Sequence, residues 1–372
     1  MPSIWCAISG HGYGHAAQVA PVLNALGTLV PGLTAILRTT VPAAFFQDRL
    51  TIPWEHSPVQ QDIGCIQNGP LTIDIDATWI AHQHFHATWS TRLSNEITAI
   101  RAASPAMVVA DIAYLAIEAG SRAQIPTIAL ASLTWDLVLK EYCHASDHAQ
   151  QQLIQHIRES YAKTDTAIRI MPAPKIDIFS KMIDIGPIAD PASPERDRLA
   201  SALDLAPNEK TVLVGFGGIP LTSLPLEQIE RLRHYRFLFD GPIPSGCSRI
   251  HSIKTLPFSF KTLLASVDVI MTKPGYGTIV EAVALQQPVL YVRRYNFADE
   301  QPLVDYLHRY GRGVELSLDD FTQGRWEAAL HQAIDIPAPS SPPPPSTGAT
   351  DAAAYIAQHF ETVGRLYPDD RS

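Results

Sequence analysis

The sequence predicts an α/β protein made of two doubly wound domains, each with a parallel sheet covered by helices on both faces. Short apolar runs typical of strands alternate with helical segments along most of the chain. A strand, a glycine-rich turn and a helix follow one another twice, at residues 3–29 and 267–285. Prolines cluster at 187–194, which is typical of a domain boundary. We therefore predict domains at residues 1–186 and 187–336.

The first domain shows strand-like runs separated by longer amphipathic segments. The alternation of the two implies parallel strands joined by helices that cross over the sheet. We expect strands at residues 3–9, 33–37, 107–111, 125–131 and 166–171, and helices at 16–29, 79–103 and 150–162.

Composition narrows the classes of function. The chain has 372 residues and 46% hydrophobic content, which is enough for two buried cores. A net charge of -9 and a pI near 5.8 argue against nucleic acid as a partner. Its four cysteines have no metal or redox spacing, and we recognise no membrane span or signal peptide, so we expect a soluble cytoplasmic protein.

The stretch from Val267 to Pro302 has the character of an anion site. A strand ends at Lys273-Pro274-Gly275-Tyr276-Gly277-Thr278, and a helix follows. Glycines let backbone N–H groups approach a ligand, and the first helical turn offers unpaired donors at the positive end of the dipole. A diphosphate would suit this turn. Thr278 and Glu281 also have the spacing of a capping box, which needs no ligand.

These residues resemble the donor signature of GT-B glycosyltransferases, above all UDP-glycosyltransferases and the bacterial enzyme that adds N-acetylglucosamine to lipid I. The resemblance implies a diphosphate at the turn, ribose hydroxyls at a glutamate, and sugar hydroxyls at an acidic-Gln pair. UDP-glycosyltransferases usually have a histidine where this chain has Lys273, a departure that bears on the choice of nucleotide. By position, the implied contacts are Lys273, Gly275, Tyr276, Gly277 and Thr278 for the diphosphate, Glu281 for the ribose, and Asp299 or Glu300 with Gln301 for the sugar.

The first strand runs into a second glycine turn, Gly10-His11-Gly12-Tyr13-Gly14-His15. The dinucleotide fingerprint requires a glycine where His15 stands, and Arg38, not an acidic residue, ends the next strand. An arginine there suits the 2′-phosphate of NADP, so a reductase is an alternative.

The same turn is similar to the first loop of GT-B enzymes, which ends in a histidine at the start of the first helix. Transfer by direct displacement needs a base at the acceptor hydroxyl, and imidazole suits neutral pH. The resemblance implies His15 as this base and Asp111, at the end of a later strand, as its orienting partner. His11 is a competing base, and both histidines are also consistent with ordinary loop residues. Gly12 and Gly14 are further predicted donor contacts.

Two patterns in the first half are compatible with metal ligands. Residues 71–76 contain Asp74-x-Asp76, but alternation predicts an ordinary strand with the aspartates facing water. His82, His84 and His86 fall in the predicted helix 79–103, where only His82 and His86 share a face. We therefore expect no metal site, and an acceptor-pocket lining is a further reading of the histidines.

The second domain repeats the strand and glycine-turn pattern. We expect strands at 211–214, 235–239 and 250–253. The resemblance places donor phosphates near Gly217 and Gly218, and the nucleobase near Phe258. Residues 337–350 are rich in proline and serine and are expected to form an extended connector. Residues 351–372 follow as a helix that returns to the first domain, as in GT-B enzymes, or as a disordered tail.

Together these features favour a metal-independent, inverting glycosyltransferase that uses a UDP-sugar cosubstrate and no cofactor. The resemblance implies two facing domains, with the donor held by the second and an unidentified hydroxyl acceptor by the first. Contact with a membrane surface is expected only if that acceptor is a lipid. The chain also resembles the amino-terminal portion of plant arabinose kinases at 10–15, 132–142 and 272–299. A module that binds a nucleotide sugar without turnover is therefore the main alternative.

Overall fold

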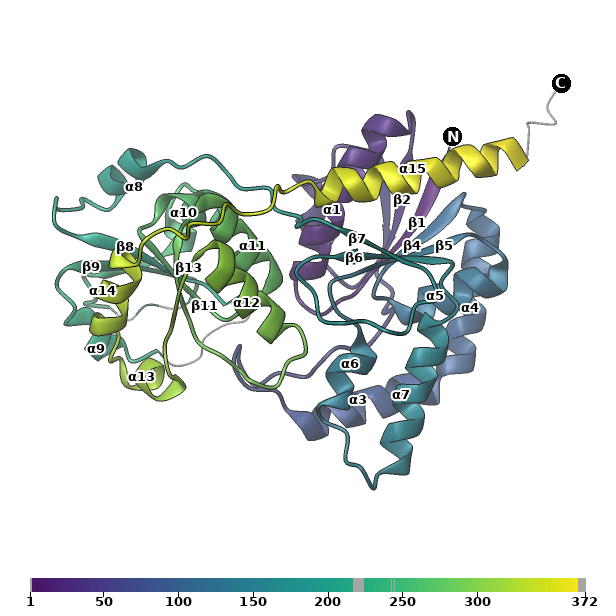
Figure 1. The fold of residues 1–372 in the computed structure, drawn as a ribbon, viewed down its shortest axis with the longest axis horizontal. Helices are drawn as coiled ribbons and strands as arrows, with labels where there is room; N and C mark the ends of the chain where they lie inside the picture. Colours follow the sequence, from purple (N-terminus) through teal and green to yellow (C-terminus); the bar gives the residue numbers. More distant parts are fainter. Residues whose placement is uncertain (1, 217–223, 242, 244, 367–372) are drawn as a thin grey trace. The chain divides into compact units, whose positions relative to one another are not determined.

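The computed structural model describes residues 2–216, 224–241, 243 and 245–366 (Figure 1). The chain divides into two compact units. One contains Met1–Ile66, Asp74–Ile188 and Ser346–Ser372, and the other contains Gln67–Ile73 and Ala189–Pro345.

The first unit is built on one parallel sheet in the order β3-β2-β1-β4-β5-β6-β7. The chain moves outward from β1 through β2 to β3 and then returns to β4 on the other side of β1. Strands β1 and β4 therefore flank the switch point of a doubly wound sheet, where such sheets bind ligands. The strands are β1 (Ser3–Ile8), β2 (Thr34–Arg38), β3 (Trp54–Ser57), β4 (Met107–Asp111), β5 (Thr127–Ala131), β6 (Thr166–Ile170) and β7 (Met182–Ile185).

Helices cover this sheet, and α15 packs along α1 (Figure 1). Ala352, Ala353 and Ile356 of α15 are fully buried, so this helix belongs to the hydrophobic core of the first unit. The helices are α1 (Gly14–Leu29), α2 (Ala44–Gln47), α3 (Ile75–Ala87), α4 (Trp89–Ala103), α5 (Tyr114–Ala123), α6 (Trp135–Lys140), α7 (His148–Tyr161) and α15 (Gly348–Leu366).

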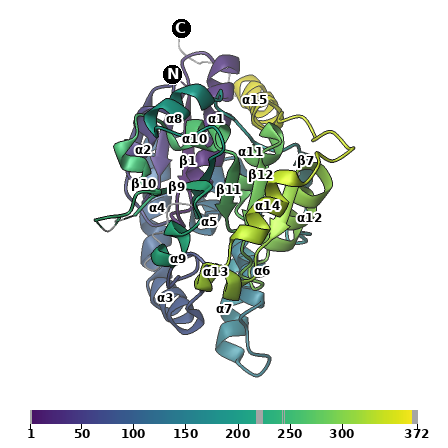
Figure 2. The same ribbon diagram turned by 90° about the vertical axis from the view of Figure 1, so that its left-hand side faces the viewer.

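The second unit has a parallel sheet in the order β10-β9-β8-β11-β12-β13, with its switch point between β8 and β11. Figure 2 shows β10, β9, β11 and β12 of this sheet. One face packs Val214, Met271 and Leu290 against Trp326 at the start of α14. Its elements are α8 (Arg196–Ala202), β8 (Lys210–Val214), α9 (Leu226–Glu230), β9 (Tyr235–Phe239), β10 (Ile250–Ser252), a 3₁₀ turn (Ile253–Thr255), α10 (Phe260–Ser266), β11 (Val269–Thr272), α11 (Tyr276–Leu285), β12 (Pro288–Tyr291), α12 (Glu300–Tyr310), β13 (Arg312–Glu315), α13 (Leu318–Gln323) and α14 (Glu327–Asp335).

The predicted fold class is confirmed, and the predicted strands 107–111 and 235–239 match β4 and β9 residue for residue. The strand predicted at 71–76 is wrong. Asp74 is instead the N-cap of α3, and its carboxylate accepts a hydrogen bond from the Ala77 amide at 2.9 Å.

Two helix boundaries also differ from the prediction. The helix predicted at 79–103 is two helices, α3 and α4, which meet at Thr88. The connector predicted to run to 350 ends earlier, because α15 begins at Gly348. In the described part of the chain, no helix has both the length and the apolar character needed to cross a membrane.

Candidate functional site

The structure brings His15 and Asp111 together at the switch point of the first sheet. His15 lies in the first turn of α1, and Asp111 ends β4 beside Ile8 of β1. The His15 Nδ1 atom is 2.9 Å from Asp111 Oδ2, and both side chains are buried. A carboxylate at Nδ1 holds the proton of a neutral imidazole on that nitrogen, which makes Nε2 the basic one.

The backbone next to Asp111 is strained. Ile112 has φ 46°, a left-handed conformation that a β-branched side chain rarely adopts. Its carbonyl accepts a hydrogen bond from the Tyr161 hydroxyl at 2.8 Å, and that hydroxyl accepts one from the Trp135 amide at 3.3 Å. Tyr161 therefore ties the loops that follow β4 and β5 together, and such strain is typical of functional sites.

The glycine turn before α1 leaves its backbone approachable. Gly12 has φ 74°, and a Cβ added at Gly12 or Gly14 would meet no other described atom within 4 Å. The His11 ring packs edge-on against Trp135, with ring centroids 5.1 Å apart, and contacts Gly64 closely. The loop is thus held on one side by side chains and is open where a ligand needs backbone donors.

Asp62 belongs to this site, although nothing in the sequence indicated it. Its Oδ1 accepts a hydrogen bond from the Ser9 hydroxyl at 3.1 Å, and its Oδ2 accepts one from the Trp135 indole at 3.0 Å. Burial raises the pKa of Asp62 to about 7, an effect that these hydrogen bonds and nearby His15 only partly offset. Asp62 lies in an irregular segment without strand or helix periodicity, so local pattern gives no signal for it.

In the second unit, Lys273 directly follows β11 at the switch point of the sheet. Lys273 is only 9% exposed. Burial, together with nearby Arg294, lowers the pKa of Lys273 to about 7, although Asp299 and Glu300 oppose part of the shift.

The helix after this turn begins earlier than predicted. Gly275 is the N-cap of α11 and Tyr276 its first residue, so Thr278 lies inside the helix and the capping-box reading is wrong. Glu281 instead pairs with Lys261 at 3.3 Å, and burial raises its pKa. A Cβ at Gly277 would meet no described atom within 4 Å, so the first turn of α11 has room beside its backbone donors.

The remaining predicted donor contacts are only partly described. The Gly215 amide donates to the Met271 carbonyl at 2.9 Å, which fixes the turn after β8 beside β11. Gly217 and Gly218 lie outside the described residues. Phe258 is half-buried, with the Arg198 guanidinium 4.8 Å above its ring.

The predicted acidic-Gln pair lies at the start of α12, and Glu300 has a role that the sequence did not indicate. Glu300 is 1% exposed and accepts hydrogen bonds from the backbone amides of Arg294 at 3.1 Å and Tyr295 at 3.0 Å, and from the Arg293 side chain. It therefore anchors the loop after β12. Gln301 accepts from Arg293 at 2.8 Å, and Asp299 lies 4.0 Å from Arg294.

The histidines of α3 form part of an aromatic cluster. As predicted, His82 and His86 share a face, with ring centroids 6.4 Å apart, whereas His84 is exposed. The His86 Nδ1 atom lies 3.2 Å from His156 Nδ1. Burial lowers the pKa of His82 to about 4 and that of His86 to about 3. No group of three or more histidine, cysteine or acidic side chains in the described regions is arranged to hold a metal ion.

Arg38, the basis of the reductase alternative, is already paired. Its guanidinium is 2.6 Å from Glu96 and lies 4.8 Å over the Trp5 ring, and its side chain is 12% exposed. The charge that an NADP phosphate would need is therefore used inside the first unit, which argues against a reductase.

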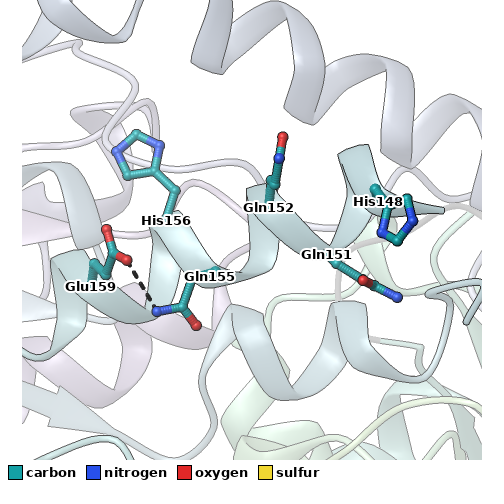
Figure 3. Close-up of a pocket in the computed structure, with 6 residues that line it drawn as sticks. All are labelled: His148, Gln151, Gln152, Gln155, His156 and Glu159. Atoms are coloured by element: carbon teal, nitrogen blue, oxygen red, sulfur yellow. Dashed lines mark hydrogen bonds between the residues drawn. The ribbon is translucent and has the colours of Figure 1, made fainter.

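A separate hollow runs along α7 (Figure 3). Its lining side chains all come from that one helix, and Gln155 donates to Glu159 within it at 3.0 Å. No loop from a strand end contributes to this lining, so we do not place the candidate site there. The lining residues are His148, Gln151, Gln152, Gln155, His156 and Glu159.

Comparison with known proteins gives one similar curated sequence. An L-arabinokinase of Arabidopsis thaliana is 25% identical over 345 residues, which cover 88% of this chain and 32% of the kinase. The chain thus spans about a third of the length of the curated relative it matches. No protein-family model matches the sequence.

Solved structures give the architecture. Phytolacca americana UGT2, complexed with UDP-2fluoro-glucose and pterostilbene, aligns with a TM-score of 0.60 and 14% identity over 100% of this chain and 96% of its own. TcCGT1 in complex with UDP aligns with a TM-score of 0.61 and 14% identity over 97% of this chain and 99% of its own. The calicheamicin glycosyltransferase CalG4 aligns with a TM-score of 0.57 and 15% identity over 98% and 95%. The predicted sequence resemblance to an arabinose kinase is thus confirmed. The solved structures show that this chain has the GT-B fold of the UDP-glycosyltransferases.

Proposed function

We propose that this chain is a glycosyltransferase that moves a sugar from a UDP-sugar to an acceptor hydroxyl with inversion at the anomeric carbon. The observation that carries the proposal is the buried His15–Asp111 pair at the switch point of the first sheet. It has the geometry of a general base whose second ring nitrogen is oriented by a carboxylate. The GT-B fold, which this chain shares with UDP-glycosyltransferases, supports the same chemistry by analogy.

In the proposed reaction, His15 Nε2 takes the proton of the acceptor hydroxyl. The acceptor oxygen then forms a bond to the anomeric carbon as the bond from that carbon to the diphosphate oxygen breaks. Asp111 stabilises the imidazolium that results. The leaving UDP collects negative charge, which the first turn of α11 and a protonated Lys273 would stabilise. This scheme needs no metal ion.

The second unit supplies the proposed donor contacts. Gly275 to Thr278 would hold the diphosphate, Glu281 the ribose, and Phe258 the base. Of the two acidic residues, Asp299 is the better candidate for the sugar hydroxyls, with Gln301 as its partner, because both carboxylate oxygens of Glu300 already accept hydrogen bonds within the loop. Residues 1–186 would bind the acceptor and 187–336 the donor, and we place the reaction in the cytoplasm. Nucleic acid has no part in it, and a membrane surface enters only with a lipid acceptor.

A two-step experiment tests this proposal. UDP-sugars are first screened by thermal shift, and the best binder is then incubated with a panel of hydroxyl acceptors while released UDP is measured. We expect stabilisation by at least one donor and release of UDP that requires an acceptor. His15→Ala is the matched control, which should bind the donor but release UDP at least about 100-fold more slowly.

A second candidate function follows from the relative in Arabidopsis. The similarity covers only about a third of that L-arabinokinase, so this chain corresponds to one part of the kinase. Such a part could bind a nucleotide sugar without turning it over. Donor binding with no UDP release, the same for the wild type and His15→Ala, would favour this binding module over the transferase.

A further inference from the structure

We propose that Asp62 positions the His11–His15 loop through Ser9 and Trp135 and, by its negative charge, stabilises the protonated form of His15. The inference rests on the proposed function, because it assigns a role beside the proposed base. Asp62 is a positioning residue, since its contacts are to Ser9 and Trp135 and not to a reacting group.

The segment from Gln61 to Gly64 is held in place by contacts at both of its ends. The Gln61 carbonyl accepts from the Leu115 amide at 3.2 Å, and its side chain donates to Glu96 at 2.9 Å. At the other end, a Cβ built on Gly64 would lie 2.5 Å from the His11 ring, so the ring rests directly on this backbone. Asp62 lies between two fixed points, which keeps its carboxylate in place.

From this position Asp62 accepts hydrogen bonds from two residues that flank the His11–His15 loop, Ser9 and Trp135. Its bond to Ser9 fixes the end of β1, where the Ser9 hydroxyl also accepts from the His11 amide at 3.4 Å. Its bond to the Trp135 indole holds a ring that packs against His11 at 5.1 Å and His15 at 6.2 Å between centroids. One buried carboxylate therefore orients the surroundings of both imidazoles.

Charge gives Asp62 a second effect. Titratable groups that interact with Asp62 include His15, Asp111, Tyr114 and Tyr161. When His15 takes the acceptor proton, the imidazolium forms near two buried carboxylates instead of one. A nearby negative charge favours the protonated form of an imidazole, so ionised Asp62 should make His15 a stronger base.

Asp62→Asn tests the inference because it keeps the shape and an acceptor oxygen while removing the charge. We expect the titration of the His15 ring, followed by NMR of ¹⁵N-labelled histidine, to move down by about 0.5 pH unit or more. With an active donor and acceptor, kcat should fall by about tenfold while KM for the donor stays within about twofold. The NMR measurement needs no turnover, so it still decides if the proposed transferase function fails.

Asp136→Asn is the matched control, because Asp136 is equally buried next to Trp135 but pairs with Arg158 at 2.6 Å. It should leave the His15 titration unchanged. An unchanged titration in Asp62→Asn, or an equal shift in Asp136→Asn, would overturn the inference.

If Asp62→Asn fails to fold, the wild-type protein carries the test. The Trp135 indole N–H resonance, identified by its loss in Trp135→Phe, should then change with pH together with the His15 ring signals. A Trp135 signal that stays constant between about pH 5 and 9 would refute the link between Asp62 and the loop.

Discussion

The buried amine of Lys273 should make donor binding depend on pH. The pKa of Lys273 is lowered to about 7, so the side chain loses its proton within the physiological range. Only the protonated amine attracts a diphosphate, and binding of the anion should in turn favour protonation. Affinity for a UDP-sugar should therefore rise as the pH falls through 7.

The expected size follows from the protonated fraction. With a pKa of about 7, roughly nine-tenths of the amines carry a proton at pH 6 and roughly one-tenth at pH 8. If the protonated form alone binds, the apparent Kd scales inversely with this fraction and increases about tenfold from pH 6 to pH 8. A tenfold change corresponds to about 1.4 kcal/mol.

Isothermal titration calorimetry with a UDP-sugar at both pH values measures this change. A sugar diphosphate ester does not itself titrate near pH 7, so the ligand adds no slope of its own. Repeating the titration in buffers of different ionisation enthalpy should show uptake of nearly one proton per donor at pH 8.

Lys273→Met should abolish the pH dependence, and Lys254→Met is the matched control. Lys254 belongs to the same unit, but its side chain is 76% exposed and pairs with Asp240 at 3.0 Å. Equal wild-type affinity at pH 6 and pH 8, or a pH slope that survives in Lys273→Met, would refute the reasoning.

Three further predictions follow from the two sheets. His15→Ala should lower kcat by about 100-fold or more and leave donor affinity unchanged, whereas equal loss of both would remove His15 from the role of base. Gly277→Ala should raise the free energy of unfolding by about 0.5 kcal/mol, because the added Cβ has room and alanine is the better helix former. The same Cβ should weaken donor binding about tenfold, because it would occupy space beside the backbone donors of α11. An unchanged affinity by calorimetry would show that the diphosphate does not bind at this turn. Asp62→Asn should be stabilising relative to the wild type at pH 8 and less so at pH 5, as measured by urea unfolding. Because the pKa of Asp62 is raised in the folded state, the free energy of unfolding of the wild type falls as the pH rises from about 4 to 7. If Asp62→Asn lowers the free energy of unfolding by the same amount at pH 5 and pH 8, this reasoning is wrong.

The sequence predicted the sheets well because their strands are short runs of buried apolar residues. Met107 to Asp111 and Tyr235 to Phe239 are such runs, and their ends can be read from the change in polarity. Helix starts were harder to predict. Glycine is a poor helix former, yet Gly14 begins α1 and Gly277 is the second residue of α11, because tertiary packing outweighs local propensity. Alternation at 71–76 suggested a strand, although Asp74 is also a good N-cap.

The candidate site was partly predictable for a different reason. Asp111 is the last residue of β4, and His15 lies just after the glycine turn that follows the neighbouring strand β1, so the parallel topology brings both to the carboxyl ends of these strands. Asp62 instead meets Ser9 and Trp135, which are 53 and 73 residues away in the sequence. No local pattern encodes a contact of that kind. The anchoring role of Glu300 was equally hidden, since it depends on how one loop folds back on a single carboxylate.

The docking of α15 on α1 has a consequence for how the protein is made. The first unit is closed by a helix that is translated only after the whole of residues 189–345. Until then the apolar surface that α15 covers stays open on the nascent chain. The second unit ends at Pro345 and does not depend on α15. It can therefore begin to fold during translation, before the first unit is complete.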